Sequence, residues 1–226
     1  DTAARSLALL NAKTKEEAAR LAGDLTALNQ SRKALTEKGK EEAIRIIETT
    51  ELKNDRVLVV YLPDCHESLA GIIAGRIREK YHRPAFVLTG GETSAKGSGR
   101  SIESYSMYEE LVKCADLMIQ FGGHPMAAGL SIDEKNIEEF RRRLNVNCTL
   151  TDEELRPKIV IDVPMPVSYI TKELVEQISL LEPFGKGNTK PVFAQKNLRV
   201  LDHSIIGKNK NVAKATAIDA AGNRME

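Results

Sequence analysis

The 226-residue sequence has no tryptophan, and aromatic residues make up only 4% of it. A nucleic-acid site built mainly on stacking bases against aromatic rings is therefore disfavoured, and contacts to phosphate groups fit the composition better. No apolar run approaches the roughly 20 residues of a membrane-spanning helix, and no signal peptide is visible at the start. Hydrophobic residues make up 42% and charged residues 29%, which is typical of a globular protein with no membrane partner.

The chain also has few cysteines and little net charge. Cys65, Cys114 and Cys148 are far apart and form no CxxC pair, so a structural zinc site is excluded and reduced thiols in the cytoplasm are expected. The formal net charge is +1, so the molecule as a whole is no generic polyanion binder. Any nucleic-acid site must therefore be a local patch.

The end of the chain reads as an interrupted hairpin. A strand-like run at 211–218 leads into a turn at 219–223, and only Arg224, Met225 and Glu226 follow it. We therefore expect a fragment of a longer protein, in which the return strand of this hairpin is missing.

Residues 15–48 are expected to form one long helix, with Thr14 and Glu17 as a capping box at its start. Its apolar stripe is narrow, which suits a helix lying along a neighbour rather than one sunk in a core. A continuous helix of this length would span about 50 Å, although Gly39 could bend it or end it early. We interpret residues 1–54 as a connector between domains, with a coiled-coil dimer as the alternative.

Residues 55–147 alternate short apolar runs with amphipathic stretches, which is typical of an α/β layer domain. The run at 57–62 is continuous and apolar, as in a buried strand. Further strands are expected at 84–88, 95–102 and 127–132, and helices at 67–81, 107–119 and 137–144.

After a polar linker, residues 155–226 are expected to form a mostly β module of the size of a partial small barrel. Strands are expected at 158–163, 191–194, 197–206 and 211–218, with a short helix at 171–180. Basic residues predominate between positions 183 and 214, where Asp202 is the only acidic residue. A basic groove on a barrel suits a single-stranded nucleic-acid backbone, whereas the alternative is a surface that lysines keep hydrated.

The segment 96–101, Lys-Gly-Ser-Gly-Arg-Ser, offers the parts of a phosphate clamp. Gly97 and Gly99 would let the backbone approach a ligand closely. Ser98 and Ser101 supply hydroxyl donors, and Arg100 supplies a planar fork that matches phosphate oxygens. A flexible turn with hydrated charges is the alternative.

A second candidate is the segment 121–129, in which Gly122 and Gly123 precede His124. We expect a tight, exposed turn that presents the imidazole to a ligand. His124 could then donate a hydrogen bond to a phosphate or assist proton transfer, or it could simply be a loop histidine.

A third candidate lies where the first expected strand meets the next helix, a common ligand position in α/β proteins. His66 falls at this point, and Asp64 beside it could serve only as a helix N-terminal residue. Arg76 and Arg78 follow on the helix, two positions apart and so on different faces, and Arg76 is our choice to face the site. No cluster of Asp, Glu and His of the two-metal type appears, so no metal site is expected on this chain.

Four motifs, in this order and at these separations, resemble the RecJ-type single-stranded-DNA exonucleases of the DHH phosphoesterase superfamily. They are Cys65-His66-Glu67-Ser68-Leu69-Ala70-Gly71-Ile72-Ile73-Ala74-Gly75-Arg76-Ile77, the 96–101 segment, Gly-Gly-His-x-x-Ala-Ala-Gly at 122–129, and Leu-Glu-Pro-Phe-Gly-x-Gly-Asn at 181–188. The third is similar to the signature of the DHHA1 domain, and the fourth to the opening of the RecJ OB-type domain. The family pattern has Pro after Gly-Asn, where this chain has Thr189.

The resemblance implies a 5′-to-3′ exonuclease in DNA repair and recombination, with single-stranded DNA, 5′-phosphorylated, as its partner. It implies that manganese or magnesium is held by a preceding DHH domain, which this chain lacks, and that this chain alone does not cut. His124 would contact the scissile phosphate region, and Ser98 and Arg100 would hold phosphate near the 5′ end. Arg76 would contact the strand backbone.

Two alternatives stay open from the sequence. One is a DHH–DHHA1 phosphodiesterase that acts on short oligonucleotides or cyclic dinucleotides, although such proteins typically end after the DHHA1 domain. The other is a non-enzymatic scaffold that binds single strands whatever their end group. All three hypotheses depend on Arg100 and His124 converging on one anion-sized hollow.

Overall fold

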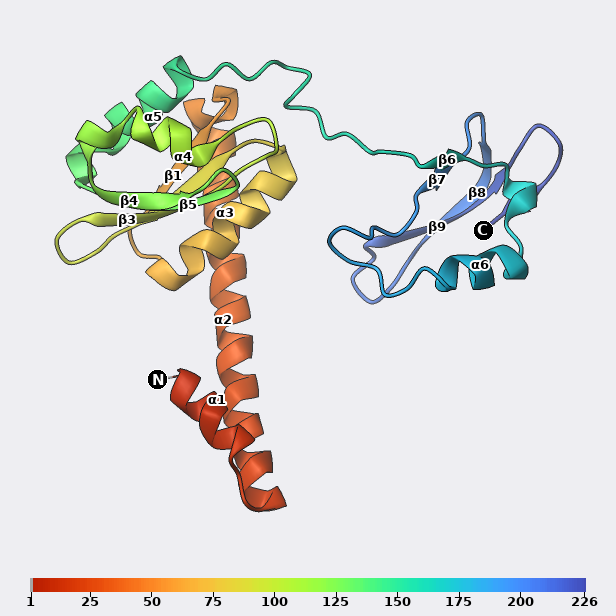
Figure 1. Cartoon of the computed structure of the whole chain (residues 1–226), viewed down its shortest axis with the longest axis horizontal. Helices are drawn as coiled ribbons and strands as arrows, with labels where there is room; N and C mark the ends of the chain where they lie inside the picture. The colour runs from red at the N-terminus through yellow and green to blue at the C-terminus, as the bar shows by residue number, and fades with distance from the viewer. Residues whose placement is uncertain (1) are drawn as a thin grey trace. The chain divides into compact units, whose positions relative to one another are not determined.

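The computed structural model describes residues 2–226. These form two compact units, and the boundary between them in the sequence falls between Pro157 and Lys158. The predicted order, a long helix, then an α/β domain, then a mostly β module, is confirmed (Figure 1). No helix within the described residues is both long and apolar enough to span a membrane.

The first unit opens with a helical hairpin of α1 (Thr2–Leu10) and α2 (Lys15–Thr49). The Thr14 hydroxyl accepts a hydrogen bond from the amide of Glu17 at 3.2 Å, so the predicted helix start is confirmed. Gly39 does not end the helix. A Cβ there would lie 2.6 Å from Cδ1 of Ile73, so the glycine lets α2 and α3 (Glu67–Tyr81) cross closely.

A five-stranded sheet follows, with the strands in the order β1-β2-β3-β5-β4. β1 and β2 pair in parallel, and all other neighbours are antiparallel. The strands are β1 (Leu58–Leu62), β2 (Ala85–Thr89), β3 (Ala95–Arg100), β4 (Met118–His124) and β5 (Ala127–Ile132). The remaining elements of this unit are α4 (Met107–Val112), α5 (Ile137–Val146) and the short 3-10 turns η1 (Glu51–Asn54), η2 (Ala115–Leu117) and η3 (Glu134–Asn136).

Each face of the sheet has its own core, and the two cores differ in extent. On one face, α4 and α5 cover the sheet, and Phe86 of β2 meets Phe140 of α5 edge-on at 5.4 Å between ring centroids. On the other face, α2 and α3 pack against apolar residues of β1 and β2, such as Val60 and Val87. β1 and β2 are therefore buried on both faces, which explains their continuous apolar runs.

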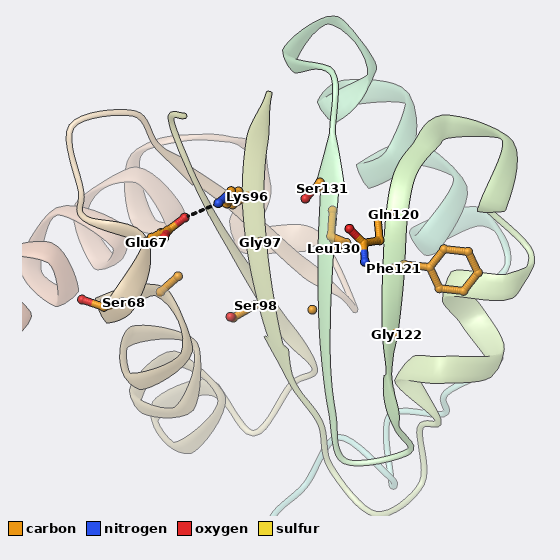
Figure 2. A pocket seen from close by; sticks show the side chains of 12 residues that line it. Glu67, Ser68, Lys96, Gly97, Ser98, Gln120, Phe121, Gly122, Leu130 and Ser131 are labelled. Carbon is orange, nitrogen blue, oxygen red and sulfur yellow. Dashed lines mark ion pairs between the residues drawn. The ribbon is translucent and has the colours of Figure 1, made fainter. Parts of the chain in front are cut away.

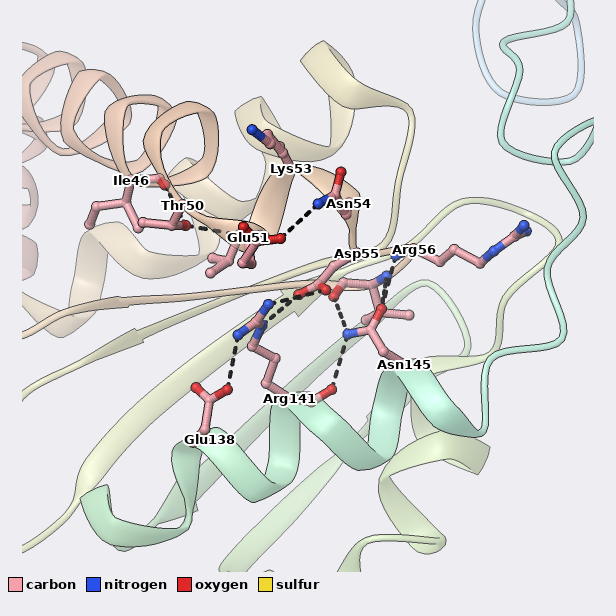
Figure 3. Close-up of polar contacts among 12 residues, drawn as sticks. Ile46, Thr50, Glu51, Lys53, Asn54, Asp55, Arg56, Glu138, Arg141 and Asn145 are labelled. Carbon is pink, nitrogen blue, oxygen red and sulfur yellow. Dashed lines mark hydrogen bonds and ion pairs between the residues drawn. The ribbon is translucent and has the colours of Figure 1, made fainter.

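A polar junction fixes α5 to the start of β1 (Figure 3). The side-chain oxygen of Asn145 accepts hydrogen bonds from the amides of Arg56 and Val57 at 2.9 and 3.0 Å, and its nitrogen donates to the carbonyl of Val57. Asp55 pairs with the guanidinium of Arg141 through both carboxylate oxygens, at 2.5 and 3.2 Å. Residues about 90 positions apart are thereby held together.

The predicted helix over 107–119 is wrong beyond Val112. α4 ends there, η2 follows, and β4 begins at Met118. The expected exposed turn at 121–129 is also corrected, because Gly122, Gly123 and His124 are the last residues of β4. The tight turn consists of Pro125 and Met126 alone, since His124 pairs with Ala127.

The second unit, Lys158–Glu226, contains a three-stranded sheet in the order β10-β9-β8 and a separate pair of short strands. Its elements are β6 (Val163–Pro164), η4 (Val167–Tyr169), α6 (Lys172–Ser179), β7 (Phe193–Ala194), β8 (Arg199–Ile206), β9 (Val212–Ile218) and β10 (Arg224–Met225). The strand expected over 158–163 is wrong except at its last residue. The return strand that was expected to be missing is present as the two-residue strand β10, which pairs with β9.

Candidate functional site: a hollow between α3 and the glycine-rich strands

The sheet face toward α3 is left partly open over β3, β5 and β4. Residues on these strands alternate between the α4–α5 core and this open face, so the pairing lines up three rows of side chains across it. The rows are Lys96–Ser131–Gln120, Ser98–Gly129–Gly122 and Arg100–Ala127–His124.

The first two rows line a hollow of about 550 Å³, a size within the usual range for small-ligand sites (Figure 2). One wall is the start of α3, including Glu67 and Ser68, and the floor is formed by the backbone of β3, β5 and β4. Hydroxyl and amide groups from Ser98, Ser131 and Gln120 face this space. The hollow therefore offers hydrogen-bond donors among apolar lining atoms.

The glycines of the two motifs face opposite sides of the sheet. A Cβ on Gly122 would meet no atom within 4 Å, and one on Gly129 only the carbonyl oxygen of Gly97 at 3.8 Å. By contrast, a Cβ on Gly99 would lie 2.5 Å from the sulfur of Met107, and one on Gly97 would press on Leu130 at 3.1 Å. The core thus requires that Gly97 and Gly99 have no side chain, while Gly97 also lines the hollow, and the expectation that they admit a ligand stays a prediction.

Arg100 lies against α3 beside the hollow. Neither Arg100 nor His124 is among the residues that line the hollow, so their convergence on it stays a prediction. Nη1 of Arg100 donates to the carbonyl of Gly99 at 2.7 Å, and its Nη2 is so close to α3 that a Cβ on Gly71 would come within 2.9 Å of it. No carboxylate pairs with Arg100 in the described part of the chain. The guanidinium thus keeps donors available for an anion, and α3 can approach it only because Gly71 has no side chain.

His124 closes the third row, and its place depends on the hairpin turn beside it. The turn is held by two backbone hydrogen bonds, from the amide of Ser101 to Met126 at 3.0 Å and from the amide of Met107 to Pro125 at 2.9 Å. His124 is exposed, and its ring has no hydrogen-bond partner among residues 2–226. Arg100 and His124 lie on one face, two strand spacings or roughly 10 Å apart, with only the small Ala127 between them.

An ion pair spans one end of the hollow, from α3 to β3. Nζ of Lys96 lies 2.9 Å from Oε2 of Glu67, and both side chains are about half exposed (Figure 2). Their hydrogen bond lowers the pKa of Glu67 and raises the pKa of Lys96, so both groups stay charged. This end of the hollow is electrically balanced, whereas the Arg100 end is not.

Other predicted site residues lie elsewhere. His66 caps α3, where its Nδ1 accepts from the amide of Ser68 at 3.2 Å, and its ring lines a second hollow of about 680 Å³ against α2. Arg76 forms an exposed ion pair with Glu79 at 3.0 Å. It lies five residues after Gly71, about 140° around the helix, and so does not face Arg100.

Ser101 and Gly123 serve the fold. The Ser101 side chain is buried, and its hydroxyl donates to the carbonyl of Tyr105 at 2.5 Å. Gly123 has a φ of +151°, and a Cβ there would lie 2.4 Å from the carbonyl oxygen of Ala127.

The structure adds Arg78 to the candidate site residues. Arg78 lies on the same side of α3 as Gly71 and Gly75, and its Nε is buried without a hydrogen-bond partner in the described chain. The seven-residue spacing from Gly71 is the sequence signal for it.

The described residues provide no group of three or more His, Cys, Asp or Glu side chains that could hold a metal ion. The polar groups around the hollow are hydroxyls, amides, the Lys96 ammonium and one carboxylate, Glu67, which is paired with Lys96. This set suits an anion rather than Mg²⁺ or Mn²⁺. The residues present therefore do not fit a divalent metal.

Comparisons with protein families identify both units. The family model of the DHHA1 domain matches residues 54–148, and that of the RecJ OB domain matches residues 161–226. The class is thereby defined: an α/β domain of the DHHA1 type followed by an OB-type module.

Relatives that are similar to nearly the whole chain specify the family within this class. The single-stranded-DNA-specific exonuclease RecJ of Bacillus subtilis is 35% identical over 212 residues, and that of Escherichia coli is 34% identical over 212 residues. These matches cover 92% and 89% of this chain, and the chain belongs to the RecJ family. It spans only 27% and 37% of the length of these two relatives.

Solved structures agree. The crystal structure of RecJ from Thermus thermophilus in complex with Mg²⁺ matches 91% of this chain and 32% of its own, with a TM-score of 0.74 at 28% identity. The Mn²⁺ complex from the same organism covers 94% of this chain and 32% of its own, with a TM-score of 0.75 at 26% identity.

Proposed function

We propose that this chain is the substrate-gripping part of an exonuclease that removes nucleotides from single-stranded DNA in the 5′-to-3′ direction. The observation that carries the proposal is the row Arg100–Ala127–His124, which brings two cationic or hydrogen-bonding groups to one open sheet face beside a hydroxyl-lined hollow. The RecJ relatives, which are named for single-stranded-DNA exonuclease activity, supply the class of polymer and reaction.

In this proposal the end of the strand lies along the glycine floor, with its 5′ phosphate at Arg100. The guanidinium donates to two phosphate oxygens, and the Ser98 hydroxyl, one row away on the same face, donates to a third. His124 donates from its ring to the adjoining phosphate. Gly122 and Gly129 leave room for the sugar–phosphate backbone to lie against the strands. Arg76 contacts the strand beyond the hollow.

The reaction needs groups that these residues do not supply. Phosphodiester hydrolysis in a two-metal site requires carboxylate and imidazole ligands, and the described residues offer no such cluster. We assign the metal, manganese or magnesium, to another domain of the protein, of the DHH type. This chain then binds and orients the strand in the cytoplasm and is inactive by itself.

A shorter substrate is the second candidate. DHHA1 domains also occur in phosphodiesterases of short oligonucleotides and cyclic dinucleotides, and the hollow alone is large enough for such a ligand. The RecJ OB match over residues 161–226 favours the longer polymer, because OB modules track single strands.

The proposal is tested by binding a single strand with either a 5′ phosphate or a 5′ hydroxyl to the chain and to its Arg100→Gln variant. We expect Arg100→Gln to weaken binding of the phosphorylated strand about tenfold, because a charge-assisted hydrogen bond contributes roughly 1.5–3 kcal/mol, and to change binding of the hydroxyl strand much less. Fluorescence anisotropy at fixed low salt measures both affinities.

Arg142→Gln is the matched control, since Arg142 is an exposed arginine of α5, on the opposite face of the sheet. It removes the same charge and should weaken both strands slightly and equally. Equal losses for the two strands with Arg100→Gln would refute end recognition and favour a scaffold that binds the backbone alone.

A further inference from the structure

The Glu67–Lys96 ion pair sits at the end of the hollow away from Arg100. Lys96 and Arg100 are four residues apart on β3, so their Cα atoms are roughly 13 Å apart along the strand. Between them lie Ser98 and the glycine floor, a neutral stretch with room for a sugar and a base. A nucleotide whose phosphate sits at Arg100 would therefore direct its nucleoside toward the ion pair.

The charges that face Lys96 leave no net attraction for a second phosphate. Glu67 contacts its ammonium at 2.9 Å, and Glu92, in the loop between β2 and β3, adds a further negative field on it. A phosphate at this end would gain one cation and meet the repulsion of Glu67 at nearly the same distance. An uncharged group meets no such penalty, because a carboxylate and an ammonium together accept and donate hydrogen bonds.

We propose that Glu67 is a specificity-determining residue, which by pairing with Lys96 makes the hollow accept a nucleotide with a single phosphate and disfavour a second phosphate at the Lys96 end. The hollow then reads a terminal phosphate with its nucleoside rather than an internal stretch of backbone. This inference rests on the proposed function, since it assumes that Arg100 holds the first phosphate.

The test compares deoxyadenosine 5′-monophosphate with deoxyadenosine 3′,5′-bisphosphate as ligands of the full chain carrying His124→Ala, so that the 3′ phosphate is not held at His124. Affinities are measured by NMR titration at low ionic strength, where charges within about 10 Å still act. The readout is the ratio of the two affinities, which cancels any effect that a substitution has on the shared phosphate and nucleoside.

We expect the preference for the bisphosphate to follow the charge at the Lys96 end. Glu67→Gln leaves an unpaired lysine and should raise the ratio by up to about fivefold, because the effect of an exposed ion pair is modest. Lys96→Gln leaves an unpaired carboxylate and should lower the ratio below that of the unchanged chain. The double variant Glu67→Gln/Lys96→Gln should return it close to the original value.

Glu109→Gln is the control, because Glu109 lies on α4, on the opposite face of the sheet, and its removal changes the total charge by the same amount. An unchanged ratio in all variants would overturn the inference. If Arg100→Gln still weakened the phosphorylated strand selectively, the proposed function would stand and only the role of Glu67 would fall. If monophosphate binding did not depend on Arg100, the proposed function itself would be refuted.

Discussion

At the scale of single residues, glycine divides this domain into a packed face and an open face. Gly97 and Gly99 sit where a methyl group would collide with the core, whereas Gly122 and Gly129 sit where it would enter empty space. The sequence shows four similar glycines in two motifs. Side-chain chemistry alone predicts Ser98 and Arg100 as phosphate donors, but only the strand register shows which glycine lies beside which surface.

This division predicts opposite effects of the same substitution. Gly99→Ala should destabilise the fold by about 1–3 kcal/mol, because its Cβ would lie 2.5 Å from the sulfur of Met107 and 2.6 Å from a ring carbon of Phe86. Gly122→Ala should change the free energy of unfolding by less than about 0.5 kcal/mol and instead weaken binding of a 5′-phosphorylated strand. Urea denaturation and anisotropy measure the two effects.

Each variant serves as the control for the other. If Gly122→Ala destabilised the domain as much as Gly99→Ala, the open face would be packed in solution. If it left strand binding unchanged, the floor of the hollow would not contact the ligand.

At the scale of elements, the sequence predicted α2, α3, β5 and α5 well because each has a clear apolar period or cap. It missed β4. The spacing of Met107, Leu111 and Cys114 continues a helical period, and the strand that follows contains Gly122 and Gly123, which weaken any strand signal. β4 is an edge strand, and one of its faces lies exposed at the hollow. It therefore lacks the apolar alternation of a half-buried strand. The glycines and the exposed face of β4, which shape the site, are thus the reason that the sequence did not predict this strand.

The junction between α5 and β1 was equally invisible in the sequence, because no local pattern links residues so far apart. Asn145→Ala should destabilise the first unit by about 3 kcal/mol, since it leaves the amide of the buried Val57 without its partner. Thermal or urea unfolding followed by circular dichroism measures the change.

Asn147→Ala is the matched control, because Asn147 lies two residues further on and its side chain makes no hydrogen bond within the described chain. A loss of similar size in both variants would show that the effect comes from helix propensity at the end of α5 rather than from the junction.

At the scale of the whole molecule, the chain combines two units with different surfaces. The first carries the hollow, and the second carries the basic stretch at 183–214 on an OB-type module. Composition predicted this division, since the charge is local rather than global and aromatic rings are scarce. The chain spans only 27% and 37% of the length of the Bacillus subtilis and Escherichia coli relatives.

The central claim is that the open sheet face of the first unit receives the phosphorylated end of a single strand. An NMR titration of the full chain with a short 5′-phosphorylated strand tests it most directly, because each backbone amide reports its own surroundings. We predict that the largest shifts fall on Ser98, Arg100, Gly122 and Gly129 and shrink when the 5′ phosphate is removed. Shifts confined to α4 and α5, or to residues 158–226 with none in the hollow, would contradict the account.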